Sequence, residues 1–218
     1  MVKNYFQHAR KPQGMGGRLF VAGMNLGHMA ISTWGLKQLT IKSQDVILDI
    51  GCGGGKNVLR MLKQARTGMV CGLDHAEICV EKTKKLNQKA VCQGRSDIRL
   101  GSVSHNPWPD NTFDVVTAFE TVYFWPDLVK DLREVRRVLK PGGLFFICNE
   151  LHPKEEGKTP YQYWIKLLDL QTYTDAEFQN MLSAAGFITI AIVSKGKNGM
   201  CLSARAQKEE SEYGTEKI

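Results

Sequence analysis

A glycine-rich segment near residue 51 has the clearest capacity to bind a ligand. It reads Ile47-Leu48-Asp49-Ile50-Gly51-Cys52-Gly53-Gly54-Gly55-Lys56-Asn57, in which an apolar run passes directly into glycines and then into a helical pattern. Glycines at such a turn allow backbone N–H groups to approach a ligand, and the start of the following helix supplies partial positive charge. The segment therefore predicts a ligand-binding loop.

Two common glycine motifs do not fit this loop. The dinucleotide fingerprint G-x-G-x-x-G needs glycine or alanine where Lys56 stands, because a long side chain would spoil the packing of the helix on the strand. The phosphate-binding P-loop needs glycine at the position of Ile50 and a hydroxyl at that of Asn57. Both motifs are therefore excluded.

Three further segments follow the loop in a recognisable order. Gly72-Leu73-Asp74 ends a second apolar run with a carboxylate, residues 108–116 lead into a fourth run, and residues 132–143 end in Lys140-Pro141-Gly142-Gly143. Together with the loop, this order resembles that of the class I S-adenosylmethionine-dependent methyltransferases that act on small molecules. The resemblance covers roughly residues 40–150.

The resemblance implies that S-adenosylmethionine is the cofactor and assigns residues to its parts. Asp49, Gly51 and Gly53 would bound the methionine part. Asp74 would hold the ribose hydroxyls, and His75 would pack against the adenine. Asp49 and Asp74 could alternatively serve only to cap loops. The full set of implied cofactor residues is Asp49, Gly51, Cys52, Gly53, Asp74, His75, Ser102, Val103 and Phe119.

The family's adenine-contacting acidic residue aligns with Ser102, whose neutral hydroxyl would contact the adenine less strongly than a carboxylate. Asp97 is the alternative. Cys52 lies inside the glycine loop and is interpreted as a small filler, because nothing near it in the sequence suggests a base.

Candidate catalytic residues follow the fourth and fifth apolar runs. Methyl transfer is an in-line displacement at an activated carbon, so positioning matters most and a base is needed only for a poor nucleophile. In the family, the residue at Glu120 faces the amino-acid end of the cofactor, and Tyr123 could flank the sulfonium because aromatic faces attract cations. His152 is the best candidate for a base, a surface histidine being the alternative. The six cysteines form no C-x-x-C pair, so no metal site is expected.

Alternating apolar runs and helical patterns must position these residues. Continuous apolar runs are typical of strands covered on both faces, and helices between them predict right-handed crossovers. The helix expected over residues 128–139 should stop at a turn formed by residues 140–143. The last two runs are joined by a loop too short for a helix, which predicts a hairpin. A capping box at residues 174–177 predicts the start of the helix before it. The expected strands are residues 46–50, 69–73, 98–103, 115–119, 144–148, 187–193 and 200–204.

The predicted fold is thus α/β: a Rossmann-like, doubly wound, mostly parallel seven-stranded sheet with a C-terminal antiparallel hairpin. A methyltransferase domain is expected at residues 41–206, with a lid insertion at 149–173. Residues 1–40 are expected to form a cap with a glycine hinge at 14–17, which would bring Met29 and Trp34 near the site. Residues 207–218 are expected to fray.

Composition and charge restrict the partners. No apolar run approaches the ~20 residues that span a bilayer, and no signal peptide is recognised, so a cytoplasmic protein without a membrane partner is expected. A small-molecule acceptor is favoured because no nucleic-acid-binding module is appended. RNA methylation is one alternative, because a net charge of +7 attracts nucleic acid. A non-catalytic cofactor-binding protein is a second alternative. The basic residues that motivate RNA are Arg60, Lys63, Lys82, Lys84, Lys85 and Lys89.

Overall fold

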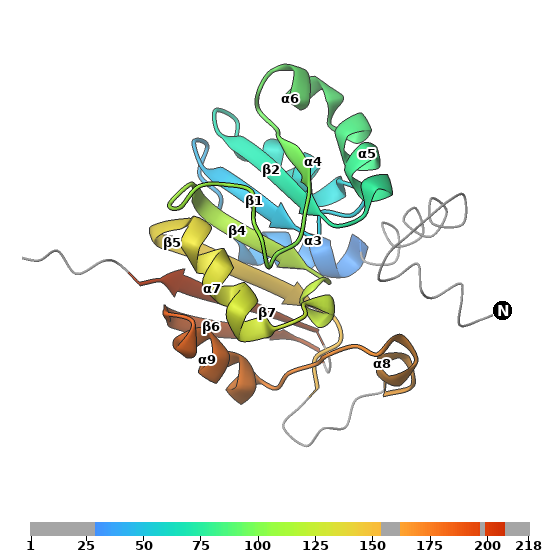
Figure 1. Ribbon diagram of the computed structural model, residues 1–218, viewed down its shortest axis with the longest axis vertical. Coiled ribbons are helices and arrows are strands. Elements are labelled where there is room, and N and C mark those ends of the chain that lie inside the picture. Colours follow the sequence, from blue (N-terminus) through green and yellow to red (C-terminus); the bar gives the residue numbers. More distant parts are fainter. Residues whose placement is uncertain (1–28, 154–161, 197–198, 208–218) are drawn as a thin grey trace, which may run out of the picture.

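Seven strands form one mixed sheet in the order β3-β2-β1-β4-β5-β7-β6 in the computed structural model, which describes residues 29–153, 162–196 and 199–207 (Figure 1). The first five strands are parallel, and β7 runs antiparallel to both β5 and β6. The predicted fold class is therefore confirmed. The strands are β1 (Val46–Ile50), β2 (Met69–Asp74), β3 (Ile98–Leu100), β4 (Phe113–Phe119), β5 (Leu139–Asn149), β6 (Phe187–Lys195) and β7 (Gly199–Ala206).

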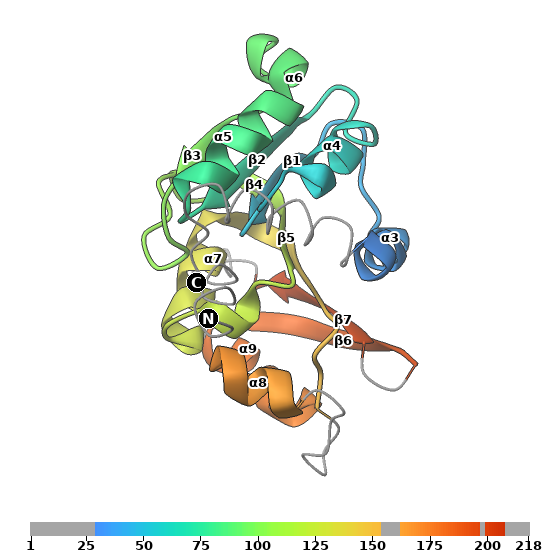
Figure 2. The same cartoon turned by 90° about the vertical axis from the view of Figure 1, so that its right-hand side faces the viewer.

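Helices cover both faces of the sheet, as Figure 2 shows. On one face lie α3 (Met29–Gln38), α4 (Lys56–Leu62) and α5 (Glu77–Leu86), the last followed by the short α6 (Gln88–Cys92). On the other face lie α7 (Leu128–Val138) and α9 (Asp175–Ala184). Successive residues of β1 are buried in opposite layers, Ile47 under the first set of helices and Leu48 under the second. This double burial explains why the strand sequences are continuously apolar.

The segment at residues 140–143 differs from its prediction. It was expected to be a turn before the fifth strand, but β5 already begins at Leu139, which pairs with Phe113 of β4. The register then shifts, so that Val115 pairs with Leu144. The proline and glycines therefore lie in an irregularity within β5, where the missing proline N–H costs little because the regular ladder is interrupted there.

One helix terminus bears on the site. At the start of α9, the Thr174 side chain accepts from the Glu177 backbone N–H, and the Glu177 carboxylate accepts from the Thr174 N–H, so the predicted capping box is confirmed. Two shorter helical segments are also present. η2 (Val122–Phe124) follows β4, and α8 (Gln162–Leu168) precedes α9.

Helix α3 contacts the sheet closely. A Cβ atom built on Gly35 would lie 2.5 Å from the Cys148 sulfur. Trp34 packs on the core of this face, with the Lys195 ammonium 5.6 Å from its ring centroid, and Met29 is half exposed. The glycine hinge at 14–17, residues 154–161 of the predicted lid and residues 208–218 lie outside the described residues. Within those described, no helix is long and apolar enough to cross a membrane.

Candidate functional site

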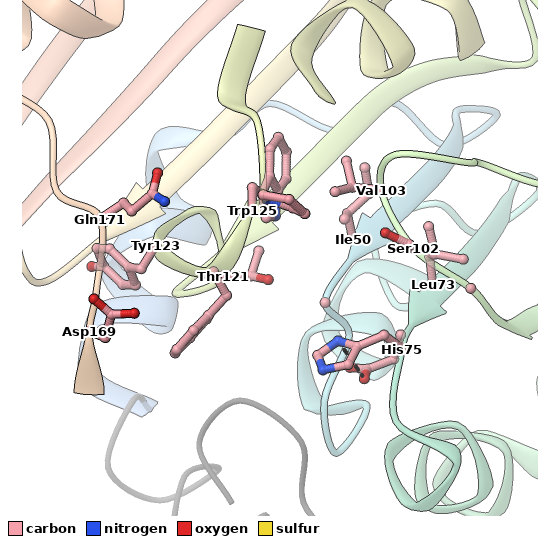
Figure 3. Close-up of a pocket in the computed structure, with 15 residues that line it drawn as sticks. Ile50, Leu73, His75, Ser102, Val103, Thr121, Tyr123, Trp125, Asp169 and Gln171 are labelled. Atoms are coloured by element: carbon pink, nitrogen blue, oxygen red, sulfur yellow. Dashed lines mark ion pairs between the residues drawn. The ribbon is translucent and has the colours of Figure 1, made fainter. Parts of the chain in front are cut away.

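A cavity of about 580 Å³ opens where the parallel strands end (Figure 3). It lies between β1 and β4. The connections that follow these two strands run in opposite directions along the sheet, and open α/β sheets bind their ligands at such a point. The walls come from the segments after β1, β2, β3 and β4 and from the connection between α8 and α9. The lining residues are Ile50, Gly51, Leu73, Asp74, His75, Gly101, Ser102, Val103, Thr121, Tyr123, Phe124, Trp125, Pro126, Asp169 and Gln171.

The glycine loop forms a tight turn in the wall of this cavity. Gly51 has φ +71°, a left-handed conformation that side chains other than glycine rarely adopt. A Cβ atom at this position would also lie 2.3 Å from Thr121 Oγ1, so the turn closely contacts the segment after β4. The Gly51 and Cys52 N–H groups both donate to the Leu73 carbonyl, at 2.8 and 3.1 Å. Glycine is therefore required at residue 51 by both conformation and space.

Asp74 joins this turn to the end of β2. One carboxylate oxygen accepts from the Gly53 N–H and the other from the Ala76 N–H, both at 2.9 Å. Burial raises the pKa of Asp74, although these two hydrogen bonds act in the opposite direction. His75 Nδ1 lies 3.9 Å from Oδ1 of the same carboxylate. Asp74 thus both lines the cavity and organises the loop beside it.

The remaining predicted cofactor residues divide into two groups. Ser102 and Val103 line the cavity together with Gly51, Asp74 and His75. The other group supports the walls from behind and is not among the lining residues; its members are Asp49, Cys52, Gly53 and Phe119.

Asp49 is the most unusual residue of the supporting group. It is buried within β1, and its Oδ1 accepts from the Thr117 hydroxyl at 2.7 Å. Burial raises its pKa to about 7, and the negative charge of Asp74 adds to the shift. The buried Cys52 sulfur lies 3.8 Å from the Thr83 hydroxyl, and burial raises the thiol pKa as well, so this side chain fills space behind the loop.

The structure brings Ser102, rather than Asp97, to the cavity. Ser102 follows β3 and accepts from the Ser104 N–H at 3.3 Å. Asp97 precedes β3, and its carboxylate lies 2.7 Å from Nε of Arg99. The contact between either residue and adenine stays a prediction.

Glu120 and Tyr123 connect the segments that follow β4 and β5. Glu120 has φ +57° and accepts hydrogen bonds from the Tyr123 hydroxyl, at 3.5 Å, and from the Glu150 N–H. The Tyr123 oxygen accepts from the Leu151 N–H at 2.8 Å. Burial and the charge of Glu120 raise the pKa of Tyr123 well above 10, so the phenol stays protonated. Tyr123 lines the cavity, whereas Glu120 lies behind it.

His152 is directed toward α9. Its Nε2 lies 2.7 Å from Oδ1 of Asp175, in the first turn of that helix, and its ring stacks on Phe178 with centroids 6.5 Å apart. His152 is not among the residues that line the cavity. Its role as a base stays a prediction.

Asp131 connects two walls of the cavity from a fully buried position in α7. Its Oδ1 accepts from the Ser104 hydroxyl at 2.6 Å, and its Oδ2 accepts from the Asp127 N–H at 3.2 Å. Ser104 follows the lining residue Val103, and Asp127 follows the lining residue Pro126. One carboxylate therefore fixes the segments after β3 and β4 relative to each other.

Sequence reasoning missed several residues of the site. The Thr83 hydroxyl donates to the Gly53 carbonyl at 2.9 Å, and the Asn87 amide donates to the Gly55 carbonyl at 3.2 Å. Their spacing of four residues on one helical face was a usable signal. Asp169 and Gln171 gave no such signal, because they belong to a segment distant in sequence from the rest of the lining.

The parallel sheet and its glycine turn, with a cavity between β1 and β4, define a doubly wound α/β ligand-binding domain. The family model described as a methyltransferase domain matches residues 48–147. An uncharacterized methyltransferase of Schizosaccharomyces pombe is 36% identical over 138 residues, which are 57% of this chain and 48% of that protein. The 27-O-demethylrifamycin SV methyltransferase of Amycolatopsis mediterranei is 37% identical over 105 residues, 48% of this chain and 38% of that one.

Among solved structures, an S-adenosylmethionine-dependent methyltransferase from Aquifex aeolicus shares the fold, with a TM-score of 0.71 and 21% identity over 86% of this chain and 97% of that one. Residues 48–147 match the methyltransferase family model, which confirms the resemblance of the motifs to those of class I S-adenosylmethionine-dependent methyltransferases. The chain spans half or less of the length of the first curated relatives it matches.

Proposed function

We propose that this chain transfers a methyl group from S-adenosylmethionine to a small-molecule acceptor bound in the cavity. The observation that carries the proposal is the glycine turn at Gly51, joined to the Asp74 carboxylate at the cavity wall. Gly51 brings the turn to the cavity wall without a side chain, and the Asp74 carboxylate in the same wall is suited to accept from ribose hydroxyls. The residues present therefore fit the cofactor of the family.

The cofactor side of the cavity consists of Gly51, Asp74, His75, Ser102 and Val103. When bound there, S-adenosylmethionine supplies a methyl group activated by its sulfonium. The protein's contribution is to hold the attacking atom of the acceptor in line with that group, an alignment that lowers barriers by up to about 7–11 kcal/mol in favourable cases.

The acceptor side consists of Thr121, Tyr123, Trp125, Asp169 and Gln171. Tyr123 and Glu120 are assigned to hold this side in shape, because they accept from the Leu151 and Glu150 N–H groups and so fasten the segment after β4 to the segment after β5. His152 contacts Asp175 rather than the cavity, so it is assigned to positioning of the same wall.

Two observations favour a small molecule over RNA. Lys84, Lys85 and Lys89 are exposed at the end of α5 and on α6, whereas the cavity lies near the start of α5. No Lys or Arg is found among the described residues that line the cavity. The Amycolatopsis relative is also named for a small-molecule substrate.

Calorimetry with S-adenosylmethionine tests the cofactor assignment. We expect micromolar affinity, about −8 kcal/mol, for the natural protein. The Asp74→Ala variant should bind about 100-fold more weakly, because it loses charge-assisted hydrogen bonds. Asp110→Ala is the matched control, since Asp110 is an exposed carboxylate paired with Arg137. Unchanged affinity of Asp74→Ala would refute the assignment.

Transfer of tritiated methyl in a cell extract tests the acceptor class. We expect the label in low-molecular-weight material. Label in RNA would favour the alternative substrate class, and cofactor binding without any transfer would favour a non-catalytic binding protein.

A further inference from the structure

Asp49 is a buried carboxyl group to which the proposed function gives no role. It lies within β1, is only 2% exposed, and accepts from the Thr117 hydroxyl at 2.7 Å. Burying a carboxylate costs free energy unless another group compensates its charge. A hydroxyl supplies one hydrogen bond and no charge, so the ionised form of Asp49 needs a further partner.

The described groups that face Asp49 are neutral or acidic. β4 contributes Thr117, and α4 contributes Met61, whose sulfur lies 3.9 Å from the same hydroxyl. The end of β2 contributes Asp74, whose negative charge raises the pKa of Asp49. The glycine loop contributes the Cys52 thiol, whose pKa is raised by burial and by both carboxylates. Among the described residues, no Lys or Arg forms an ion pair with Asp49.

Two carboxyl groups therefore flank the glycine turn. Asp74 lies in the cavity wall and accepts from the Gly53 N–H at 2.9 Å. Asp49 lies behind the wall, since Ile50 and Gly51, the two residues that follow it, both line the cavity. Charges that are buried away from water are screened much less than exposed ones. Both carboxyls therefore act on the charge of a ligand bound at the turn.

Methyl transfer changes the charge of the ligand at this turn. S-adenosylmethionine carries a positive sulfonium, whereas S-adenosylhomocysteine, which lacks the methyl group, is a neutral thioether of otherwise identical structure. A nearby cation favours the ionised form of a carboxyl group, and a neutral ligand does not. The donor can therefore supply the charge that Asp49 lacks, and the product cannot.

We propose that Asp49 makes the cofactor side of the cavity bind the sulfonium donor in preference to its neutral product. The proposal rests on the proposed function and adds a specificity-determining residue to it. Asp49 acts through its charge from behind the wall, without touching the ligand. Once the methyl group has left, that charge no longer has a cation to compensate it, and release of the product is favoured.

Calorimetry with the two ligands at about pH 8, above the raised pKa of Asp49 of about 7, tests the preference. Asp49→Asn should weaken S-adenosylmethionine about ten-fold and S-adenosylhomocysteine less than about two-fold. Asp45→Asn is the matched control and should change neither affinity, because Asp45 is a buried carboxyl at the other end of β1 that accepts from the Lys42 N–H. Equal losses for both ligands in Asp49→Asn would indicate a structural role and overturn the proposal.

The preference should also depend on pH. In the natural protein, the affinity for S-adenosylmethionine relative to S-adenosylhomocysteine should rise about ten-fold between about pH 5.5 and 8.5, as Asp49 ionises. Thr117→Val keeps both carboxyls but removes the hydrogen bond that lowers the pKa of Asp49, so its rise should move to higher pH.

The same profile in Asp49→Asn should be flat. A rise that persists in this variant would belong to another group, such as His75 in the cavity wall, and would overturn the proposal. Binding of both ligands with a constant ratio at every pH would overturn it while leaving the proposed function intact. Failure of the natural protein to bind either ligand would overturn the proposed function as well.

Discussion

The proposed cofactor side and the proposed acceptor side of the cavity are held by different kinds of contact. On the cofactor side, backbone N–H groups of the glycine turn donate to the Leu73 carbonyl and to Asp74. On the acceptor side, side chains of one segment bind the backbone of another: the Glu120 and Tyr123 oxygens accept from the Glu150 and Leu151 N–H groups. Backbone geometry depends little on most side chains, so the first arrangement is suited to a constant cofactor. The second can change residue by residue and is suited to a variable acceptor.

Replacing Gly51 should break the cofactor side with the largest effect. Gly51→Ala adds about 1–2 kcal/mol of left-handed backbone strain and a contact that Thr121 cannot accept without moving. We expect cofactor affinity, measured by calorimetry, to fall more than about 100-fold, equivalent to about 3 kcal/mol.

Gly94→Ala is the matched control. Gly94 has φ +69°, but a Cβ there meets nothing within 4 Å. It should lose stability through strain alone and keep its cofactor affinity. If both variants lost affinity equally, the contact with Thr121 would not matter.

Asp131→Asn should disturb both sides at once. The asparagine can accept from only one of the two donors, Ser104 or Asp127, so one wall loses its anchor. We expect a loss of about 1–3 kcal/mol in the free energy of unfolding, measured with urea, because a buried hydrogen bond to a charged group is removed. Cofactor affinity and acceptor KM should both weaken. A change in only one of them would show that the two sides are independent.

Asp49 should make stability depend on pH. Because its pKa is raised from 3.8 to about 7 in the folded protein, folding favours the protonated carboxyl. This contribution is complete below about pH 4 and is lost as the pH rises through about 7. Relative to Asp49→Asn, which still accepts from Thr117, the natural protein should lose stability between about pH 4 and 7 in urea titrations. Parallel pH profiles for the two proteins would contradict the buried carboxyl's role.

His152→Asn should have the smallest effect on chemistry. Because the imidazole contacts Asp175 and Phe178, its removal should change kcat by less than about five-fold, well below the 10²–10⁴-fold that general acid–base catalysis contributes. A measured loss of more than about 100-fold would restore His152 as the base.

The difference between the two sides also explains what the sequence could predict. The runs at 46–50 and 69–73 became strands because double burial makes their sequences continuously apolar, and the glycine loop is a local motif. Thr83 and Asn87 were readable in principle from their shared helical face. Asp169 was not, because its place in the cavity wall depends on the contact between its segment and the segment after β4, which no local pattern encodes.

Residues 140–143 show a second limit. Proline and glycine predict an interruption, and one is present, but the pairing of Leu139 with Phe113 decides that it falls inside β5. Turn residues indicate where a ladder breaks. They do not indicate whether the strand resumes on the same partner, since that depends on the neighbouring strand.

The contact between Gly35 and Cys148 restricts how α3 can vary. Glycine within a helix costs about 1 kcal/mol relative to alanine, yet even alanine here would collide with the thiol. The two positions therefore share a fixed volume, and a bulkier residue at one is tolerated only if the other shrinks. Tracing paired changes at these positions through relatives would show whether this helix stays seated on the sheet as the family diverges.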